Sequence, residues 1–261
     1  MKKTLIALAV AASAAVSGSA MAAWTASGIG GSVNFGGTLS PIEKVVPWEV
    51  KVWDAMTNLD QKIQKGQREV YINLDRAIPI VGIRTSESKA FTGQDGISPQ
   101  VDFNGKAEVK YVLDGQGTLK IQLHDKVKHE KIGELIAPML VGAEFSAVGG
   151  PHEGLAKMIA SKPGEGFYGG LPISTTGLLD SYYSRVSALD SDIVAHFDTQ
   201  GQSNKDNRAD FVDFKGDGVT YSAYYAAGLE KGQRVRIILD KPVESDDVAW
   251  EATLPITVSY I

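Results

Sequence analysis

The sequence contains no cysteine, which excludes disulfides, thiolate nucleophiles and cysteine metal sites. It has only four histidines and no H-E-x-x-H motif; His124 and His129 lie five residues apart around a charged stretch, where solvated side chains are usual. No serine lies in a G-x-S-x-G motif, and Gly28 to Gly30 lack the third glycine of a dinucleotide fingerprint. The acidic residues between 206 and 217 lack the spacing of a calcium loop. We therefore expect no enzyme, no resident metal and no cofactor.

The sequence also lacks clusters of basic residues, internal repeats and low-complexity linkers. Its formal net charge is −5. Removing an N-terminal segment that contains Lys2 and Lys3 and no acidic residue changes this charge from −5 to −7. Such an acidic chain is a poor partner for nucleic acid or for anionic membranes.

The single long apolar run lies at the N-terminus and has the form of a secretory signal peptide. The chain begins Met-Lys-Lys, continues with an apolar run from Thr4 to Val16, and then reads Ala20-Met21-Ala22, a small-residue cleavage site. This run is too short for a transmembrane helix. We assign residues 1–22 to the signal peptide and expect an exported mature chain that begins at Ala23.

Most of the mature chain reads as short strands separated by glycine, asparagine and proline turns, a spacing that favours a β-sandwich. The predicted strands lie at 48–52, 70–74, 78–83, 101–103, 109–113, 119–123, 132–148, 219–226, 234–239 and 254–260. Pro79 predicts an edge or a bulge at its strand. Residues 132–148 read as one or two strands, although their length also allows a helix.

The periodicity changes between residues 150 and 200, where we predict a helical insert. His152 to Ser161 is compatible with a short helix. Between 175 and 199 apolar residues recur every three or four positions, which predicts one long helix or two short ones. Residues 200–218 are polar and contain glycine, and we expect a loop there.

An alternating strand with one apolar face also lies close to the mature N-terminus. Residues 27–39 read SGIGGSVNFGGTL and place Ile29, Val33, Phe35 and Leu39 on one face, with Gly31 on the same face. This segment either completes its own sandwich or docks on a neighbouring subunit by β-strand addition.

The C-terminal strand has the same character. Leu254, Ile256, Val258 and Tyr260 share one face, and the sequence ends at Ile261. An ordinary sandwich edge explains this pattern, and so does a strand that lines an open apolar groove in an incomplete sandwich.

Four stretches resemble the K88 (F4)-type fimbrial subunit family: GSVNFGGTLS at 31–40, FYGGL at 167–171, TYSAYYAAGLEKGQ at 220–233 and LPITVSYI at 254–261. The resemblance implies an immunoglobulin-like pilin sandwich that lacks its final strand. It also implies export through a periplasmic chaperone and an outer-membrane usher, followed by polymerisation by donor-strand exchange with other copies or related subunits. The product would be an extracellular fimbrium.

The resemblance also assigns roles to residues. The donor strand at 23–40 would use Ile29, Gly31, Val33, Phe35 and Leu39. A second set, in the C-terminal strand, would contact the chaperone: Leu254, Ile256, Val258, Tyr260 and the terminal carboxylate of Ile261. Residues 41–261 would form the sandwich and its insert.

In this family the subunit can itself be the adhesin, which implies binding of a host glycoconjugate. Sugar sites combine an aromatic or apolar platform with converging polar groups. The candidates near the insert are Lys162, Glu165, Tyr168 and Tyr183. The competing interpretation is structural, with Phe167 in the framework and with Lys162 and Glu165 solvated. The alternative to a fimbrial subunit is a self-contained, secreted carbohydrate-binding β-sandwich.

Overall fold

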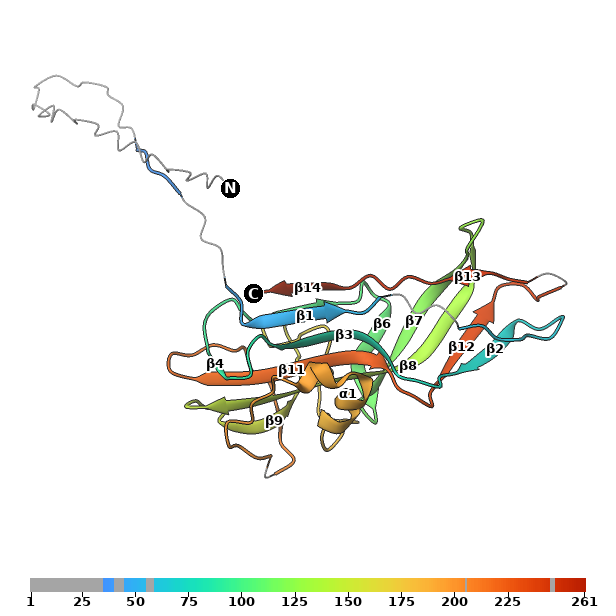
Figure 1. Cartoon of the computed structure of the whole chain (residues 1–261). Coiled ribbons are helices and arrows are strands. Elements are labelled where there is room, and N and C mark those ends of the chain that lie inside the picture. The colour runs from blue at the N-terminus through green and yellow to red at the C-terminus, as the bar shows by residue number, and fades with distance from the viewer. Residues whose placement is uncertain (1–34, 40–44, 55–58, 205, 245–246) are drawn as a thin grey trace, which may run out of the picture. The chain divides into compact units, whose positions relative to one another are not determined.

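The computed structural model describes residues 35–39, 45–54, 59–204, 206–244 and 247–261 (Figure 1). The chain divides into two units, Met1–Lys44 and Val45–Ile261. The predicted signal peptide, and residues 23–34 and 40 of the predicted donor strand, lie outside the described residues. Among the described residues, no helix is long and apolar enough to cross a membrane.

The second unit is built from strands with little helix, so the prediction of a mainly β fold with a helical insert is confirmed. The strands are β1 (Trp48–Val52), β2 (Glu69–Asn73), β3 (Ile78–Thr85), β4 (Phe91–Thr92), β5 (Pro99–Asp102), β6 (Ala107–Leu113), β7 (Gln116–Asp125), β8 (Lys131–Val148), β9 (Gly154–Met158), β10 (Ala209–Asp210), β11 (Thr220–Leu229), β12 (Arg234–Leu239), β13 (Trp250–Glu251) and β14 (Thr257–Tyr260). The helices are α1 (Tyr183–Leu189) and the 3₁₀ helix η1 (Ser191–Val194).

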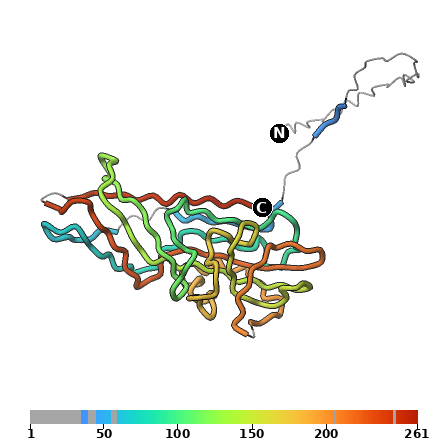
Figure 2. Tube along the Cα trace, turned by 180° about the vertical axis from the view of Figure 1, so that it is seen from behind, coloured from blue at the N-terminus to red at the C-terminus, as the bar shows by residue number. Residues whose placement is uncertain are grey.

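Twelve strands form one sheet around β8, and the remaining two form a second sheet. The main path of the large sheet is β1-β3-β11-β8-β12-β2, and β7 and β9 also pair with β8. The small sheet contains β5 and β14. The long strand β8 therefore connects both ends of the body, as Figures 1 and 2 show.

The burial of β8 changes along its length. Its first half alternates between buried and partly buried residues, whereas almost every residue from Met139 onward is buried. Strand β11 is buried on both faces as well. In an alternating strand this requires cover on both sides. One cover is the small sheet and the other is the helical insert. In Figure 1 the insert, which contains α1, and the small-sheet strand β14 lie on opposite sides of β11.

Two apolar clusters result from this layering. The main cluster lies between the sheets and includes Phe145 and Tyr225. The second cluster lies under the insert and joins Leu140 and Tyr224 to Tyr182 and Val186 of the insert. On β8 and β11, the buried apolar residues with odd numbers thus enter the main cluster, and those with even numbers enter the second cluster.

Several predicted elements are confirmed and one is corrected. Residues 132–148 lie in one strand. The bulge expected at Pro79 is present in β3, because Ala227 of β11 pairs with Val81 and the next residue, Gly228, pairs with Pro79. The prediction that residues 152–161 form a short helix is wrong, because this stretch contains the strand β9, which pairs with β8. The periodic stretch 175–199 contains two short helices, α1 and η1, which is the second of the two alternatives that the periodicity allowed, and Asp190 separates them.

Candidate functional site

Strand β1 has an unpaired edge and an incompletely covered apolar face. Among the described residues it pairs only with β3. Trp48 is 6% exposed, but Val50 and Val52, which share its face by alternation, are 39% and 54% exposed. The face of β1 that starts in the core therefore becomes uncovered along the strand.

Strand β14 has the same two properties. In the described part of the chain it pairs only with β5. Its core-facing residues are partly buried and pack against the main cluster; they are Leu254, Ile256, Val258 and Tyr260. The residues between them are exposed. The alternation begins before the strand, since Ala252 and Leu254 already lie on the same face without a ladder partner among the described residues.

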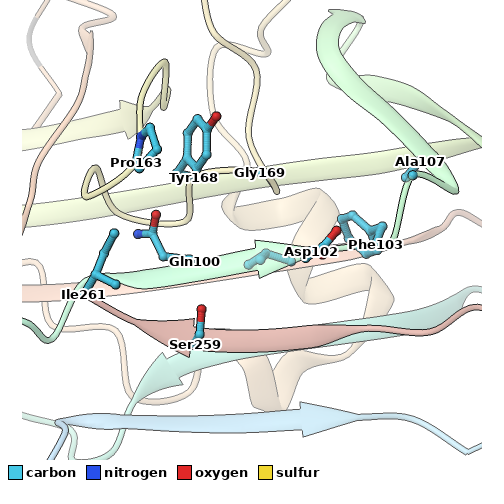
Figure 3. Close-up of a pocket in the computed structure, with 11 residues that line it drawn as sticks. Gln100, Asp102, Phe103, Ala107, Pro163, Tyr168, Gly169, Ser259 and Ile261 are labelled. Carbon is cyan, nitrogen blue, oxygen red and sulfur yellow. The ribbon is translucent and has the colours of Figure 1, made fainter.

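The two strands lie along the same side of the body and run in opposite directions (Figures 1 and 3). Both contribute to the cluster between the sheets. Strands with one partner leave backbone N–H and C=O groups available for another strand. We call β1 and β14 the edge pair, and their half-exposed apolar faces make it the strongest candidate for a binding site in the described structure.

The last residue of the chain is held in position. The backbone N–H of Ile261 donates to the carbonyl of Ser98 at 3.2 Å, and the N–H of Ser98 donates to the carbonyl oxygen of Ile261 at 3.2 Å. The Ile261 residue is 50% exposed. Ile261 is therefore held at the surface, next to the end of β14.

The predicted donor residues are only partly described. Phe35 and Leu39 are 94% and 99% exposed. Ile29, Gly31 and Val33 lie outside the described residues.

Tyr168 is the predicted sugar-site residue that the structure places at a pocket (Figure 3). This pocket has a volume of about 410 Å³, and Pro163 and Tyr168 line it together with Asp102 and Ser259 of the small sheet. Asp102 Oδ1 accepts the N–H of Asn104 at 2.7 Å. The pocket thus combines an aromatic ring with a carboxylate and a hydroxyl.

The expectation that Glu165 is solvated is wrong. This residue is 4% exposed, and its carboxylate accepts the N–H of Ser161 at 2.5 Å and the N–H of Lys162 at 3.2 Å. A buried carboxylate requires such donors. Glu165 therefore closes the turn before Phe167, and Lys162 is exposed as predicted.

Tyr183 lies on the other side of the large sheet from Tyr168. It projects from α1, is 47% exposed and contacts Tyr224 edge to face, and Tyr224 belongs to the cluster under the insert. Tyr168 instead packs against the cluster between the sheets. The structure therefore does not bring Tyr168 and Tyr183 into one site.

The framework interpretation of Phe167 is confirmed. Its side chain is fully buried, with a positive φ of 61°, and its ring stacks on Tyr225 at a centroid distance of 5.4 Å. Trp48 meets the same ring edge to face at 5.7 Å. The FYGGL stretch thus anchors the insert to the core beside β1.

A buried carboxylate that the sequence pattern did not predict holds the insert. Glu144 of β8 is 3% exposed and accepts the N–H of Tyr182 at 2.7 Å, the hydroxyl of Ser181 at 2.9 Å and the hydroxyl of Tyr224 at 2.7 Å. Burial and the neighbouring carboxylate raise the pKa of Tyr224 well above its usual value. The available signal was a single glutamate in the apolar run from Met139 to Phe145.

Comparisons with known proteins agree over the full length of the chain. A family model described as "Fimbrial, major and minor subunit" matches residues 1–261. K88 fimbrial protein AC of Escherichia coli is 30% identical over 288 residues, and K88 fimbrial protein AB of the same organism is 29% identical over 289 residues. K88 fimbrial protein AD of Escherichia coli is 26% identical over 295 residues, and all three alignments cover 100% of both chains.

Proposed function

Because this chain belongs to the family of major and minor fimbrial subunits, and is thus a structural subunit of an extracellular fimbrium, we propose that it polymerises by donor-strand exchange. In this proposal residues 23–40 of one copy dock on the edge pair of the next copy. The observation that carries the proposal is the edge pair itself, two strands that each lack a second partner among the described residues and share a half-exposed apolar face.

The dimensions of the two partners agree. Residues 29–39 in extended form span about 35 Å, and the alternating residues 252–260 span about 30 Å, at roughly 3.3 Å per residue. Complete burial of Ile29, Val33, Phe35 and Leu39 contributes on the order of 6–12 kcal/mol before the cost of ordering. Since β1 and β14 run in opposite directions, the inserted strand is antiparallel to one of them and parallel to the other.

Before assembly, the same surface needs protection during export. We propose that a periplasmic chaperone occupies the edge pair and contacts the half-exposed face of Leu254, Ile256, Val258 and Tyr260. The fixed and exposed terminus at Ile261 offers a carboxylate to a basic side chain of that chaperone. An outer-membrane usher would then exchange the chaperone for the donor strand of the next subunit.

Supplying the missing strand within the same chain tests the proposal. We expect a mature chain whose residues 23–40 are deleted at the N-terminus and appended after Ile261 through a short flexible linker to be a soluble, stable monomer. The same deletion without the appended segment is expected to be poorly soluble, because the edge pair stays open. Size-exclusion chromatography and thermal unfolding measure the difference, and a scrambled segment is the control.

The opposite result identifies the alternative class. If the chain without residues 23–40 is a monomer as stable as the complemented chain, the sandwich is self-contained and the donor-strand proposal fails. The subunit is then a self-contained β-sandwich, as in the alternative prediction, and its assembly into a fimbrium uses other contacts.

We further propose that the subunit binds a host glycoconjugate at the pocket beside Tyr168. The tyrosine ring offers a platform for the apolar face of a sugar, and Asp102 and Ser259 offer acceptors for its hydroxyls. Lys162 lies on the same turn as Pro163 and would contact the sugar at the rim of the pocket. Glu165 would act indirectly, because its carboxylate fixes the backbone of that turn.

Substitution of single tyrosines tests this site. We expect Tyr168→Ala to weaken binding of fimbriae to immobilised host glycans by about tenfold or more, which corresponds to about 1.4 kcal/mol. Tyr111→Ala removes a tyrosine that is 70% exposed on β6 and is the matched control. Binding that is unchanged by Tyr168→Ala and lost in Tyr183→Ala would move the site to α1.

A further inference from the structure

The outer face of β1 makes a second set of contacts that the edge pair does not use. By alternation Trp48 and Val50 face the core, whereas Glu49 and Lys51 face the insert. Strand β1 is five residues long and has one partner strand in the described structure. A short strand with a single ladder frays easily unless other contacts hold it.

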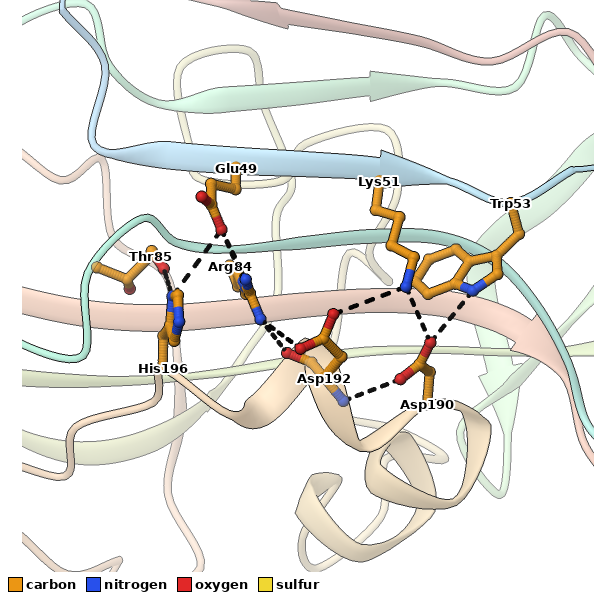
Figure 4. A network of polar contacts seen from close by, with 8 residues as sticks. All are labelled: Glu49, Lys51, Trp53, Arg84, Thr85, Asp190, Asp192 and His196. Carbon is orange, nitrogen blue, oxygen red and sulfur yellow. Dashed lines mark hydrogen bonds and ion pairs between the residues drawn. The ribbon is translucent and has the colours of Figure 1, made fainter.

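Two carboxylates of η1 and its N-cap supply such contacts (Figure 4). Lys51 Nζ lies 3.2 Å from Asp190 Oδ2 and 3.6 Å from Asp192 Oδ2. Trp53 Nε1 donates to Asp190 Oδ2 at 3.2 Å, and Lys51 Nζ lies 4.5 Å from the centre of the Trp53 ring. The segment from Lys51 to Trp53 is therefore tied to the insert.

Strand β3 joins the same network. Arg84 donates to the carbonyl of Asp192 at 2.7 Å and to its carboxylate at 2.9 Å, and it also pairs with Glu49 of β1 at 2.8 Å. A Cβ on Gly82 would lie 2.9 Å from Ile193 and 3.1 Å from Trp53, so the glycine allows these two side chains to close over β3. We call Lys51, Trp53, Arg84, Asp190 and Asp192 the β1 latch.

The centre of the latch is partly buried. The side chains of Arg84 and Asp190 are 21% and 24% exposed, whereas those of Lys51 and Asp192 are 52% and 55% exposed. Partial burial raises the pKa of Asp190, but the N–H of Asp192 and the ammonium of Lys51 outweigh this and lower it below its usual value. Networks of this kind stabilise more than isolated surface pairs do.

We propose that the β1 latch positions β1 as a wall of the donor-strand site, so that the insert controls how long a docked donor strand is retained. The proposal rests on donor-strand exchange, and it gives the insert a role in assembly that is separate from adhesion. The latch acts through β1 and does not contact the donor strand, so its members are positioning residues. Loosening the latch should therefore accelerate donor release.

The dissociation rate of assembled fimbriae tests the proposal. The variants are Asp190→Asn and Asp192→Asn, which keep the shape of each side chain and remove its charge. The control is Arg236→Gln, which breaks the bidentate pair between Arg236 and Glu69 at 2.9 and 3.0 Å, on the opposite edge of the same sheet. Assembled fimbriae are incubated in guanidinium, and the loss of polymer bands on unheated gels over time gives the rate of subunit release.

We expect the Asp190→Asn and Asp192→Asn fimbriae to release subunits about fivefold faster than wild-type fimbriae, and the Arg236→Gln fimbriae at the wild-type rate. Thermal unfolding of the self-complemented chain separates this effect from general destabilisation. If the latch only stabilises the fold, its variants lower the melting temperature of the self-complemented chain. Their fimbriae then release subunits no faster than those of a control variant with the same melting temperature. Lys51→Met, which breaks the latch from the β1 side, should reproduce the faster release if an aspartate variant fails to fold.

Two negative outcomes are distinguishable. If wild-type subunits assemble and all variants release subunits at the same rate, the latch does not position β1 and the inference is wrong. If wild-type subunits form no polymer that depends on residues 23–40, donor-strand exchange itself fails.

Discussion

Val33→Asp is expected to abolish polymerisation while the subunit still binds its chaperone. In the proposed complex Val33 lies near the middle of the docked face, and its loss removes about 1.5–3 kcal/mol of apolar burial. The larger effect is the introduced carboxylate, which costs several kcal/mol when it is buried without a partner. Chaperone pull-down followed by unheated gel ladders measures both properties.

Val127→Asp is the matched control for this variant. Val127 is 79% exposed in the turn between β7 and β8, so the same substitution adds the same charge without burying it. We expect normal ladders from Val127→Asp. Normal ladders from Val33→Asp would show that residue 33 is not a buried donor position.

Gly142→Ala is expected to detach the insert from the large sheet. A Cβ at this position would lie 1.9 Å from Cδ1 and 2.3 Å from Cε1 of the Tyr182 ring, which is fully buried. Overpacking typically costs about 1–3 kcal/mol, and an overlap this close belongs at or above the upper end of that range. Thermal unfolding of the self-complemented chain measures the cost.

A second substitution tests the cause. Tyr182→Ala alone should destabilise by about 3–5 kcal/mol, because it leaves a cavity under the insert. In that background Gly142→Ala should cost less than about 1 kcal/mol, since the overlapping ring is gone. Additive costs would locate the effect of Gly142→Ala in the backbone and not in the contact with Tyr182.

Elements that depend on local pattern were predicted with accurate bounds. Residues 48–52 and 234–239 were predicted as strands and have these bounds in the structure. Each reads as an alternating segment between turn residues, and alternation is a property of neighbours in the chain. The C-terminal face of Leu254 to Tyr260 was predicted for the same reason.

Elements that depend on a distant partner were predicted less well. Residues 154–158 become a strand because β8 presents an edge to them, and no local feature records that edge. Glu144 is buried because Tyr182 of the insert and Tyr224 of β11, both far away in the sequence, enclose it. Glu165 bonds within its own turn, but the contacts of that turn with Gln100 and Val212 join residues far apart in the sequence. Tyr168 and Tyr183 lie fifteen positions apart, and only the position of the insert decides that they face opposite sides of a sheet.

The amino-acid order by itself determined which side chains share a face, because a strand alternates with a period of two wherever it lies. It also determined that both terminal segments carry an apolar face. Only the tertiary structure decided that β1 and β14 each have a single partner among the described residues and that they border the same core. Strand pairing joins residues far apart in the chain, so an unpaired edge becomes visible only when all the other strands have been placed.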